Sequence, residues 1–200
     1  GLSVLNAALT QSFAGMLQMA AWESVVRTLV RKGVLEAFER EVFRTPRGKA
    51  STEFRLEDLT LSEEQQRVFE GIRALCEEDE ANAALLFGVT GSGKTQVFIK
   101  LIEACLKDGK QAMLLVPEIS LTPQLLAKFR GLFGEDIAVI HSSLSMGERL
   151  DEYRRIRTGK AKISIGTRSS VFAPFDNLGL IILDEEGEHS YKSDSAPRYH

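Results

Sequence analysis

One eight-residue stretch constrains this chain more than any other. Residues 88–95 read Gly-Val-Thr-Gly-Ser-Gly-Lys-Thr, which fits the phosphate-loop pattern G-x-x-x-x-G-K-[ST] at every fixed position. An apolar run at residues 83–87 precedes this stretch and is short enough for a buried parallel strand. Apolar residues recur at helical spacing from Val97 to Leu106, and Gly109 supplies a stop. The sequence therefore predicts a strand, a glycine-rich loop and a helix start in direct succession.

Such a loop places a row of backbone N–H groups at the positive end of a helix dipole, an arrangement that binds polyphosphate. The glycines let the backbone approach the phosphates, Lys94 reaches the terminal ones, and the Thr95 hydroxyl can ligate Mg²⁺. The alternative is a glycine-rich turn that matches by chance. The expected nucleotide contacts are Gly88, Val89, Thr90, Gly91, Ser92, Gly93, Lys94 and Thr95.

Composition is that of an ordinary globular protein. The chain has 200 residues, of which 44% are hydrophobic and 26% charged, which suggests one domain plus a fragment or two small domains. A net charge of −3 excludes a polybasic tail. Cys76 and Cys105 lie far apart without CxxC spacing, so we expect buried thiols in a reducing compartment and no zinc site here. The first 21 residues are neither a good signal peptide nor a membrane span, and the start at Gly1 suggests a piece of a longer protein.

The residues before the phosphate loop suggest a small separate unit. Apolar residues from Trp22 to Val30 form one face of a helix that Gly33 ends, and residues 34–36 and 40–44 read as two short strands. This pattern predicts a winged-helix-like domain over residues 1–46, which could touch nucleic acid or only join domains. Residues 47–60 have the turn-rich composition of a linker, and residues 61–200 form the remaining domain.

Gln65 has two possible roles. Ser62 and Gln65 form a capping box at the start of a helix, in which the serine caps the third amide and the glutamine reaches back. A glutamine just ahead of a phosphate-loop strand can instead read adenine through its amide. The sequence leaves both interpretations open.

Strands and helices alternate after the phosphate loop. Residues 111–116, 137–140, 162–166 and 178–183 read as strands, Thr122-Pro123 starts one helix, and Ser145 with Glu148 is a second capping box. This alternation predicts an α/β fold with a mainly parallel sheet covered by helices on both faces.

Two carboxylates follow the last apolar strand. Asp184 can hold Mg²⁺ through water, and Glu185 can orient and deprotonate an attacking water. An acidic turn after a core strand would look similar, but the spacing of about ninety residues from the phosphate loop favours the catalytic interpretation. That spacing is too long for a small GTPase and suits a RecA-like P-loop NTPase lobe of a motor protein.

Three further stretches are specific: PEISLTPQ at 117–124, GTRSSVFAPF at 166–175, and Ser190-Tyr191-Lys192 with Pro197-Arg198-Tyr199-His200 after the carboxylates. With GVTGSGKT and HSSLSMGERLDEYRR, they make residues 59–200 resemble the primosomal protein N′ family, the superfamily 2 helicases of bacterial replication restart. The resemblance implies an ATP-driven 3′-to-5′ DNA helicase of the cytoplasm that recognises stalled forks.

The resemblance also implies residue roles. It supports Gln65 as the adenine-reading residue and Lys94, Asp184 and Glu185 as catalytic, with ATP and Mg²⁺ as cofactors. It implies single-stranded and forked DNA, primosome proteins and single-strand-binding protein as partners, and no membrane. The DNA contacts that it implies are Thr122, Gln124, Thr167, Arg168, Tyr191, Arg198 and Tyr199.

Two departures from the family stand out. Position 187 is Gly where the family usually has His, which puts the coupling of the two lobes in doubt, and His189 is a possible substitute. The second motor lobe, its arginine finger and the zinc-binding cysteines are expected only beyond His200. Two other hypotheses remain: another superfamily 2 DNA translocase, or a non-catalytic DNA- or primosome-binding module.

Overall fold

The computed structural model describes residues 25–34, 55–78, 80–89 and 91–192, and the backbone divides into two compact units, residues 1–42 and 43–200. In the smaller unit residues 25–31 are helical. The N–H of Gly33, at φ 70°, donates to the Val30 carbonyl, and the N–H of Val34 donates to the Leu29 carbonyl, both at 3.0 Å. These two bonds form the Schellman motif, so the predicted stop at Gly33 is confirmed. Trp22 and nearly all of the predicted hairpin lie outside the described residues.

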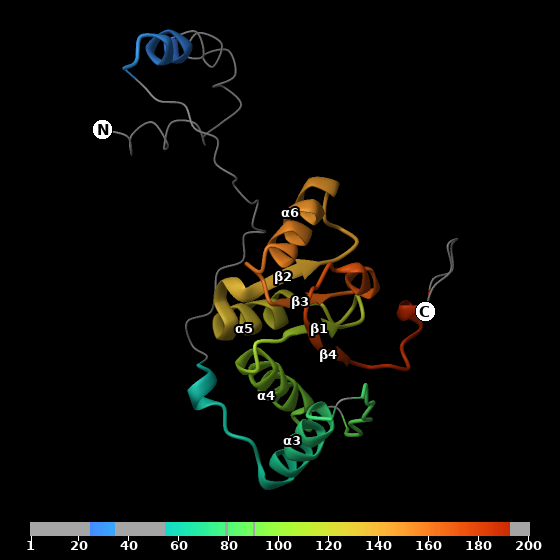
Figure 1. Ribbon diagram of the computed structural model, residues 1–200. Coiled ribbons are helices and arrows are strands. Elements are labelled where there is room, and N and C mark those ends of the chain that lie inside the picture. The colour runs from blue at the N-terminus through green and yellow to red at the C-terminus, as the bar shows by residue number, and fades with distance from the viewer. Residues whose placement is uncertain (1–24, 35–54, 79, 90, 193–200) are drawn as a thin grey trace. The chain divides into compact units, whose positions relative to one another are not determined.

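The larger unit alternates strands and helices, as Figure 1 shows. Its elements are η2 (Leu56–Asp58), α3 (Glu63–Cys76), α4 (Lys94–Lys107), β1 (Gln111–Leu115), α5 (Pro123–Phe133), η3 (Gly134–Asp136), β2 (Ile137–Ile140), α6 (Met146–Arg157), β3 (Ile163–Gly166), η4 (Arg168–Phe172), β4 (Leu178–Leu183) and η5 (His189–Tyr191). The four strands predicted after the phosphate loop are confirmed.

Local chemistry sets the helix starts. Both predicted capping boxes are present: the side chain of Ser62 accepts from the Gln65 N–H, and that of Ser145 accepts from the Glu148 N–H. The Thr122 side chain caps α5 by accepting from the Leu125 N–H at 3.2 Å. Each cap satisfies an amide that the first helical turn leaves without a partner.

The sheet has strand order β2-β3-β1-β4, and all three strand pairs are parallel. Because parallel strands point the same way, all four carboxyl ends lie at one edge of the sheet. The loops that leave β1, β2, β3 and β4 therefore start side by side at this edge, which the open α/β folds use for ligands.

Helices α4 and α5 cover one face of the sheet. Side chains of α4 (Phe98, Ile99, Ile102) and α5 (Phe129, Phe133) pack there against alternate residues of the strands, namely Ala112, Leu114, Ile137, Val139, Ile163, Ile165 and Ile182. Burying an aliphatic or aromatic side chain of this kind contributes roughly 1.5–3 kcal/mol. This face therefore holds the main hydrophobic core.

The opposite face is covered over β2 and β1. Ile156 of α6 packs on Ala138 and Ile140 of β2, and Tyr191 packs on Met113 and Leu115 of β1. The predicted sheet with cover on both faces is confirmed, since these residues alternate along the strands with those of the main core. On β4, by contrast, Ile181 and Leu183 are exposed.

The strand predicted at residues 83–87 is not formed, and that prediction is wrong for this structure. These residues have no regular secondary structure; Leu86 packs against the main core, while Leu85 and Phe87 are 75% and 91% exposed. A parallel strand exists only through its ladder with a neighbour. Among the described residues the run pairs with no strand, so its apolar composition alone does not make it one.

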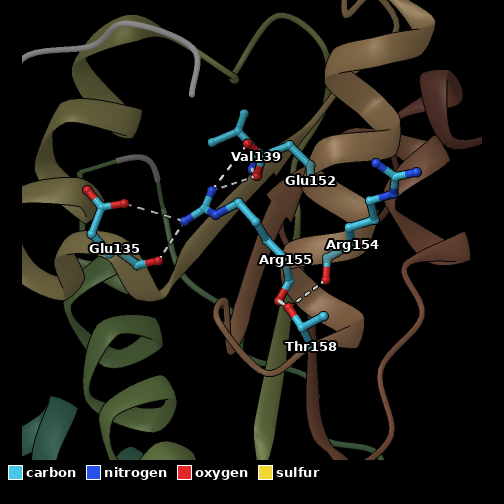
Figure 2. A network of polar contacts seen from close by, with 6 residues as sticks. All are labelled: Glu135, Val139, Glu152, Arg154, Arg155 and Thr158. Carbon is cyan, nitrogen blue, oxygen red and sulfur yellow. Dashed lines mark hydrogen bonds and ion pairs between the residues drawn. The ribbon is translucent and has the colours of Figure 1, made fainter. Parts of the chain in front are cut away.

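A buried ion pair attaches α6 to the outer strand of the sheet (Figure 2). The Glu152 carboxylate, 1% exposed, accepts from Arg155 Nη1 at 2.9 Å and from the Val139 N–H at 3.2 Å. Arg155 Nη2 donates to the Glu135 carbonyl at 2.7 Å. Burial raises the pKa of the Glu152 carboxyl, and the neighbouring Arg155 guanidinium opposes this. The pair thus fixes α6 to β2 and η3 through hydrogen bonds at both ends.

Replacing Glu152 by Ala should lower the free energy of unfolding by about 3–5 kcal/mol, because it leaves the Arg155 charge buried without its partner. The matched control is Glu135→Ala, which removes an exposed carboxylate 3.7 Å from Arg155 and keeps the carbonyl that Arg155 uses. Its effect should stay within about 0.5 kcal/mol. Urea unfolding of both variants measures the difference, and equal destabilisation would contradict this role of Glu152.

Candidate functional site

The phosphate loop crosses from residues 85–87, of which Leu85 and Phe87 are exposed, to the first turn of α4. Gly91 and Gly93 lie at φ 82° and 83°, in the left-handed region that favours glycine. A Cβ on Gly93 would come within 2.3 Å of the Gln65 Nε2, so a side chain there would displace the Gln65 amide and would also be strained at this φ. Thr90 lies outside the described residues. The loop is thus a backbone cradle at a helix start, the geometry that holds phosphate.

Lys94 folds over this cradle. Its Nζ donates to the carbonyl oxygens of Gly88, at 2.6 Å, and Val89, at 3.2 Å. These two acceptors belong to the loop itself, and neither is part of the hydrophobic core. An incoming phosphate oxygen can therefore replace them without disturbing the packing of the sheet.

The side chain of Gln65 serves the helix cap and the phosphate loop together. Its Oε1 accepts from the Ser62 N–H at 2.9 Å, and its Nε2 donates to the Ser92 carbonyl at 3.1 Å. The capping role is confirmed. The amide also ties the start of α3 to the loop, a contact between residues 27 positions apart that the sequence pattern does not show. A role in reading adenine stays a prediction, and it requires the amide to release both partners.

Asp184 and Glu185 follow β4 at the carboxyl edge of the sheet. Burial raises the pKa of the Asp184 carboxyl, and the nearby Glu185 charge raises it further, while the Glu185 N–H and Lys94 act in the opposite direction. Lys94 and Asp184 are therefore close enough to interact electrostatically. Anionic Asp184 is disfavoured by burial and by its neighbour, so a divalent cation at this point would relieve both effects. The Thr95 hydroxyl and the Asp184 carboxylate are oxygen donors of the kind that Mg²⁺ binds.

The backbone at Glu185 is unusual. It lies at φ 52°, a region that costs a non-glycine residue of order 1–3 kcal/mol and that clusters at active sites. Ser120, in the loop after β1, lies with its Oγ 3.4 Å from Glu185 Oε2 and donates to it. Sequence reasoning missed Ser120 as a neighbour of the carboxylate pair, since only the alignment of β1 beside β4 brings them together.

The side chains that are expected to contact DNA differ in how exposed they are. Gln124 is exposed, and Thr122 is half-buried with its hydroxyl already capping α5. Thr167, by contrast, is 4% exposed and Tyr191 is 5% exposed. Both side chains are packed into the protein, so DNA contact by them stays a prediction, and it requires them to leave these positions. Arg168 donates to the Lys192 carbonyl.

Four residues that the sequence analysis singled out remain. Arg198 and Tyr199 lie outside the described residues. At Gly187 a Cβ would meet nothing within 4 Å, so the turn does not itself require glycine, and His189 is exposed.

Within the described part of the chain, no group of three or more His, Cys, Asp or Glu side chains could hold a metal ion. The described helices include none long and apolar enough to span a membrane.

A groove of about 650 Å³ lies elsewhere, between α3 and α4 and the segment before α3. Its lining includes Leu59 and Phe69 together with the charged residues Lys100, Glu103 and Asp108. It runs along the second half of α4, whereas the phosphate loop enters the first turn. The residues that can bind phosphate therefore lie at the phosphate loop and not in this groove.

A phosphate loop at a helix start and a carboxylate pair at the carboxyl edge of the same parallel sheet define a RecA-like nucleotide-binding lobe. The model of the DEAD/DEAH box helicase family matches residues 62–199. The chain belongs to this helicase family.

Several curated relatives are each described as replication restart protein PriA. The Bacillus subtilis protein is 48% identical over 177 residues, which cover 88% of this chain and 22% of the relative. The Synechocystis protein is 40% identical over 178 residues, covering 88% and 21%, and the Haemophilus influenzae protein is 48% identical over 142 residues, covering 71% and 19%. The chain thus resembles these replication-restart proteins and spans about a fifth of their length.

Lys94→Ala should abolish tight nucleotide binding and leave the fold intact, because the ammonium group contacts only loop carbonyls. Titration with a fluorescent adenine nucleotide and Mg²⁺ measures the affinity. Lys107→Ala is the matched control, since it removes an equal charge from an exposed position at the other end of α4, where Lys107 pairs with Glu103. Equal affinities of the wild type and the Lys94 variant would contradict the phosphate-loop assignment.

Proposed function

We propose that this chain is the ATP-binding part of an ATP-dependent 3′-to-5′ DNA helicase that restarts replication at stalled forks. One observation carries the proposal: the Lys94 charge of the phosphate loop acts on the Asp184 carboxyl, in a chain that is 48% identical over 177 residues to a replication restart protein. Family membership supports nucleotide use and DNA as the substrate class. The 3′-to-5′ direction, ATP and Mg²⁺ belong to the proposal.

Different residues of the chain have different roles in hydrolysis. The amides of the phosphate loop bind the phosphates, and Lys94 exchanges the Gly88 and Val89 carbonyls for phosphate oxygens. Thr95 and Asp184 would hold Mg²⁺, which supplies charge neutralisation on the phosphates when bound. Glu185 orients a water molecule and accepts its proton. Gln65 is the candidate for reading adenine once it leaves Ser62 and Ser92.

The DNA strand would pass along the loops at the carboxyl edge of the sheet. Gln124 offers an exposed amide in the first turn of α5, and the Arg168 guanidinium, at the start of η4 after β3, suits contact with phosphate irrespective of sequence. We further propose single-stranded and forked DNA, primosome proteins and single-strand-binding protein as partners, in the cytoplasm. The proposed organisation is a winged-helix-like domain at 1–46, a linker at 47–60 and the lobe at 61–200, with zinc in another part of the whole protein.

In the whole protein, Glu185→Gln should retain ATP binding but lower DNA-stimulated hydrolysis by roughly 10²- to 10⁴-fold, because the carboxamide cannot accept the proton of the attacking water. Unwinding of a fork that carries a 3′-tailed strand should be lost with it. Phosphate release and strand displacement from labelled forks measure the two activities. The control is Glu186→Gln, one residue further along the same exposed turn.

Near-normal hydrolysis by the Glu185 variant, with loss in the Glu186 variant, would move the base to Glu186. A wild-type protein that hydrolyses ATP without unwinding any fork would contradict the helicase proposal. It would favour the alternative hypothesis of a DNA-dependent translocase.

Residues 1–200 alone should bind Mg-nucleotide weakly and hydrolyse it very slowly, with no stimulation by single-stranded DNA. In two-lobe motors an arginine of the other lobe meets the charge that develops on the γ-phosphate, and it contributes roughly 10³- to 10⁵-fold in turnover. Within the described residues Arg168 instead contacts the Lys192 carbonyl. Steady-state phosphate release with and without DNA is the measurement, and strong stimulated turnover would overturn the two-lobe argument.

A further inference from the structure

The buried tyrosine after the acidic turn makes a specific contact with the candidate active site. Tyr191 is 5% exposed, and its ring packs on Met113 and Leu115 of the central strand β1. Its hydroxyl donates to the Asp184 carbonyl oxygen at 2.8 Å. A ring enclosed in this way has no face available for an unpaired base, so its function must be sought inside the protein.

The contact fixes a single peptide unit, which joins Asp184 to Glu185. The carbonyl of this unit accepts from Tyr191 at 2.8 Å, and its N–H, on Glu185, lies close enough to the Asp184 carboxylate to lower the pKa of that carboxyl. A peptide unit is planar, so fixing the direction of the carbonyl also fixes the direction of the N–H. The Tyr191 hydroxyl therefore helps to orient the N–H that stabilises the charged form of the Asp184 carboxylate.

The other side of Asp184 is fixed by the same strand that supports the ring. The Asp184 N–H donates to the Leu115 carbonyl at 2.9 Å, which extends the ladder between β1 and β4. Leu115 thus contacts both residues: its carbonyl accepts from the Asp184 N–H, and its side chain packs against the Tyr191 ring. At Glu185 the chain turns through the left-handed region, a conformation that persists only where its surroundings hold it.

The segment that carries Tyr191 is itself held in place. The Tyr191 N–H donates to the Glu188 carbonyl at 3.3 Å, and the Lys192 N–H donates to the His189 carbonyl at 3.0 Å. Arg168, on the loop after β3, donates to the Lys192 carbonyl. These bonds hold the Tyr191 backbone in place, so its hydroxyl can hold the Asp184 carbonyl in a fixed direction.

We infer that Tyr191 is a positioning residue for Asp184: its buried hydroxyl orients the peptide that sets the direction of the carboxylate toward a divalent cation. This inference rests on the proposed function, because it assigns Asp184 the role of holding Mg²⁺. It replaces DNA contact as the role of Tyr191.

The test is Tyr191→Phe in the whole protein, which removes the hydroxyl and keeps the ring and its packing. The Mg²⁺ concentration that half-saturates nucleotide binding should rise roughly 10-fold, the lower end of what loss of an outer hydrogen-bond partner costs a metal site. The turnover number should fall by a similar factor, while the affinity for single-stranded DNA stays that of the wild type. Without any ligand, the Glu185 amide should exchange its hydrogen faster.

Tyr153→Phe is the matched control, since it removes a hydroxyl from a half-buried tyrosine that packs over β2 and away from the acidic turn. It should leave the Mg²⁺ dependence and the exchange of Glu185 unchanged. Unchanged Mg²⁺ dependence and unchanged amide exchange in the Tyr191 variant would overturn the inference. So would a selective loss of DNA affinity, which would return Tyr191 to the DNA surface.

The two proposals fail in different ways. A wild-type protein without DNA-stimulated hydrolysis would contradict the proposed function, and the exchange rate of the Glu185 amide would still decide the role of Tyr191.

Discussion

The parallel ladder β2-β3-β1-β4 is the constraint on which the rest of this structure depends. Parallel pairing requires a crossover between every two strands, which buries the strands under helices and brings all carboxyl ends to one edge. The loops after β1, β3 and β4 carry Ser120, Arg168 and Asp184, residues that are up to 64 positions apart in the chain. Their proximity is a product of the ladder. The carboxylates, their serine neighbour and the loops that we propose to face DNA therefore form a site only while the four strands stay in register.

The parts of the fold that the sequence predicted are those with local causes. The bounds of β2 and β4 were predicted to the residue, because each is a short apolar run between turn residues. The starts of α3 and α6 were predicted because a serine and an acidic or amide residue three positions later satisfy each other's backbone N–H. The phosphate loop was recognisable because glycines at this fixed spacing before Lys94 and Thr95 are what a backbone needs to approach a phosphate closely.

The parts that could not be predicted depend on distant partners. Residues 83–87 have strand composition, but no ladder partner exists among the described residues. Tyr191 reads as a surface aromatic in a polar segment, and its burial follows only from its position over β1. Glu152 and Arg155 lie in a helix of high charge, and only the structure shows that η3 and β2 enclose both side chains. In each case the neighbouring sequence contains no signal that tells whether the residue is buried or paired.

The central claim is that the phosphate loop and the acidic turn are two walls of one nucleotide site. Hydrogen–deuterium exchange of the whole protein, with and without Mg-ADP, tests it most directly. The account predicts slower exchange at residues 91–95 and at residues 184–188 together, and less protection of the acidic turn when Mg²⁺ is left out. Protection of the groove between α3 and α4 in place of these segments, or of the phosphate loop with no response at the acidic turn, would contradict it.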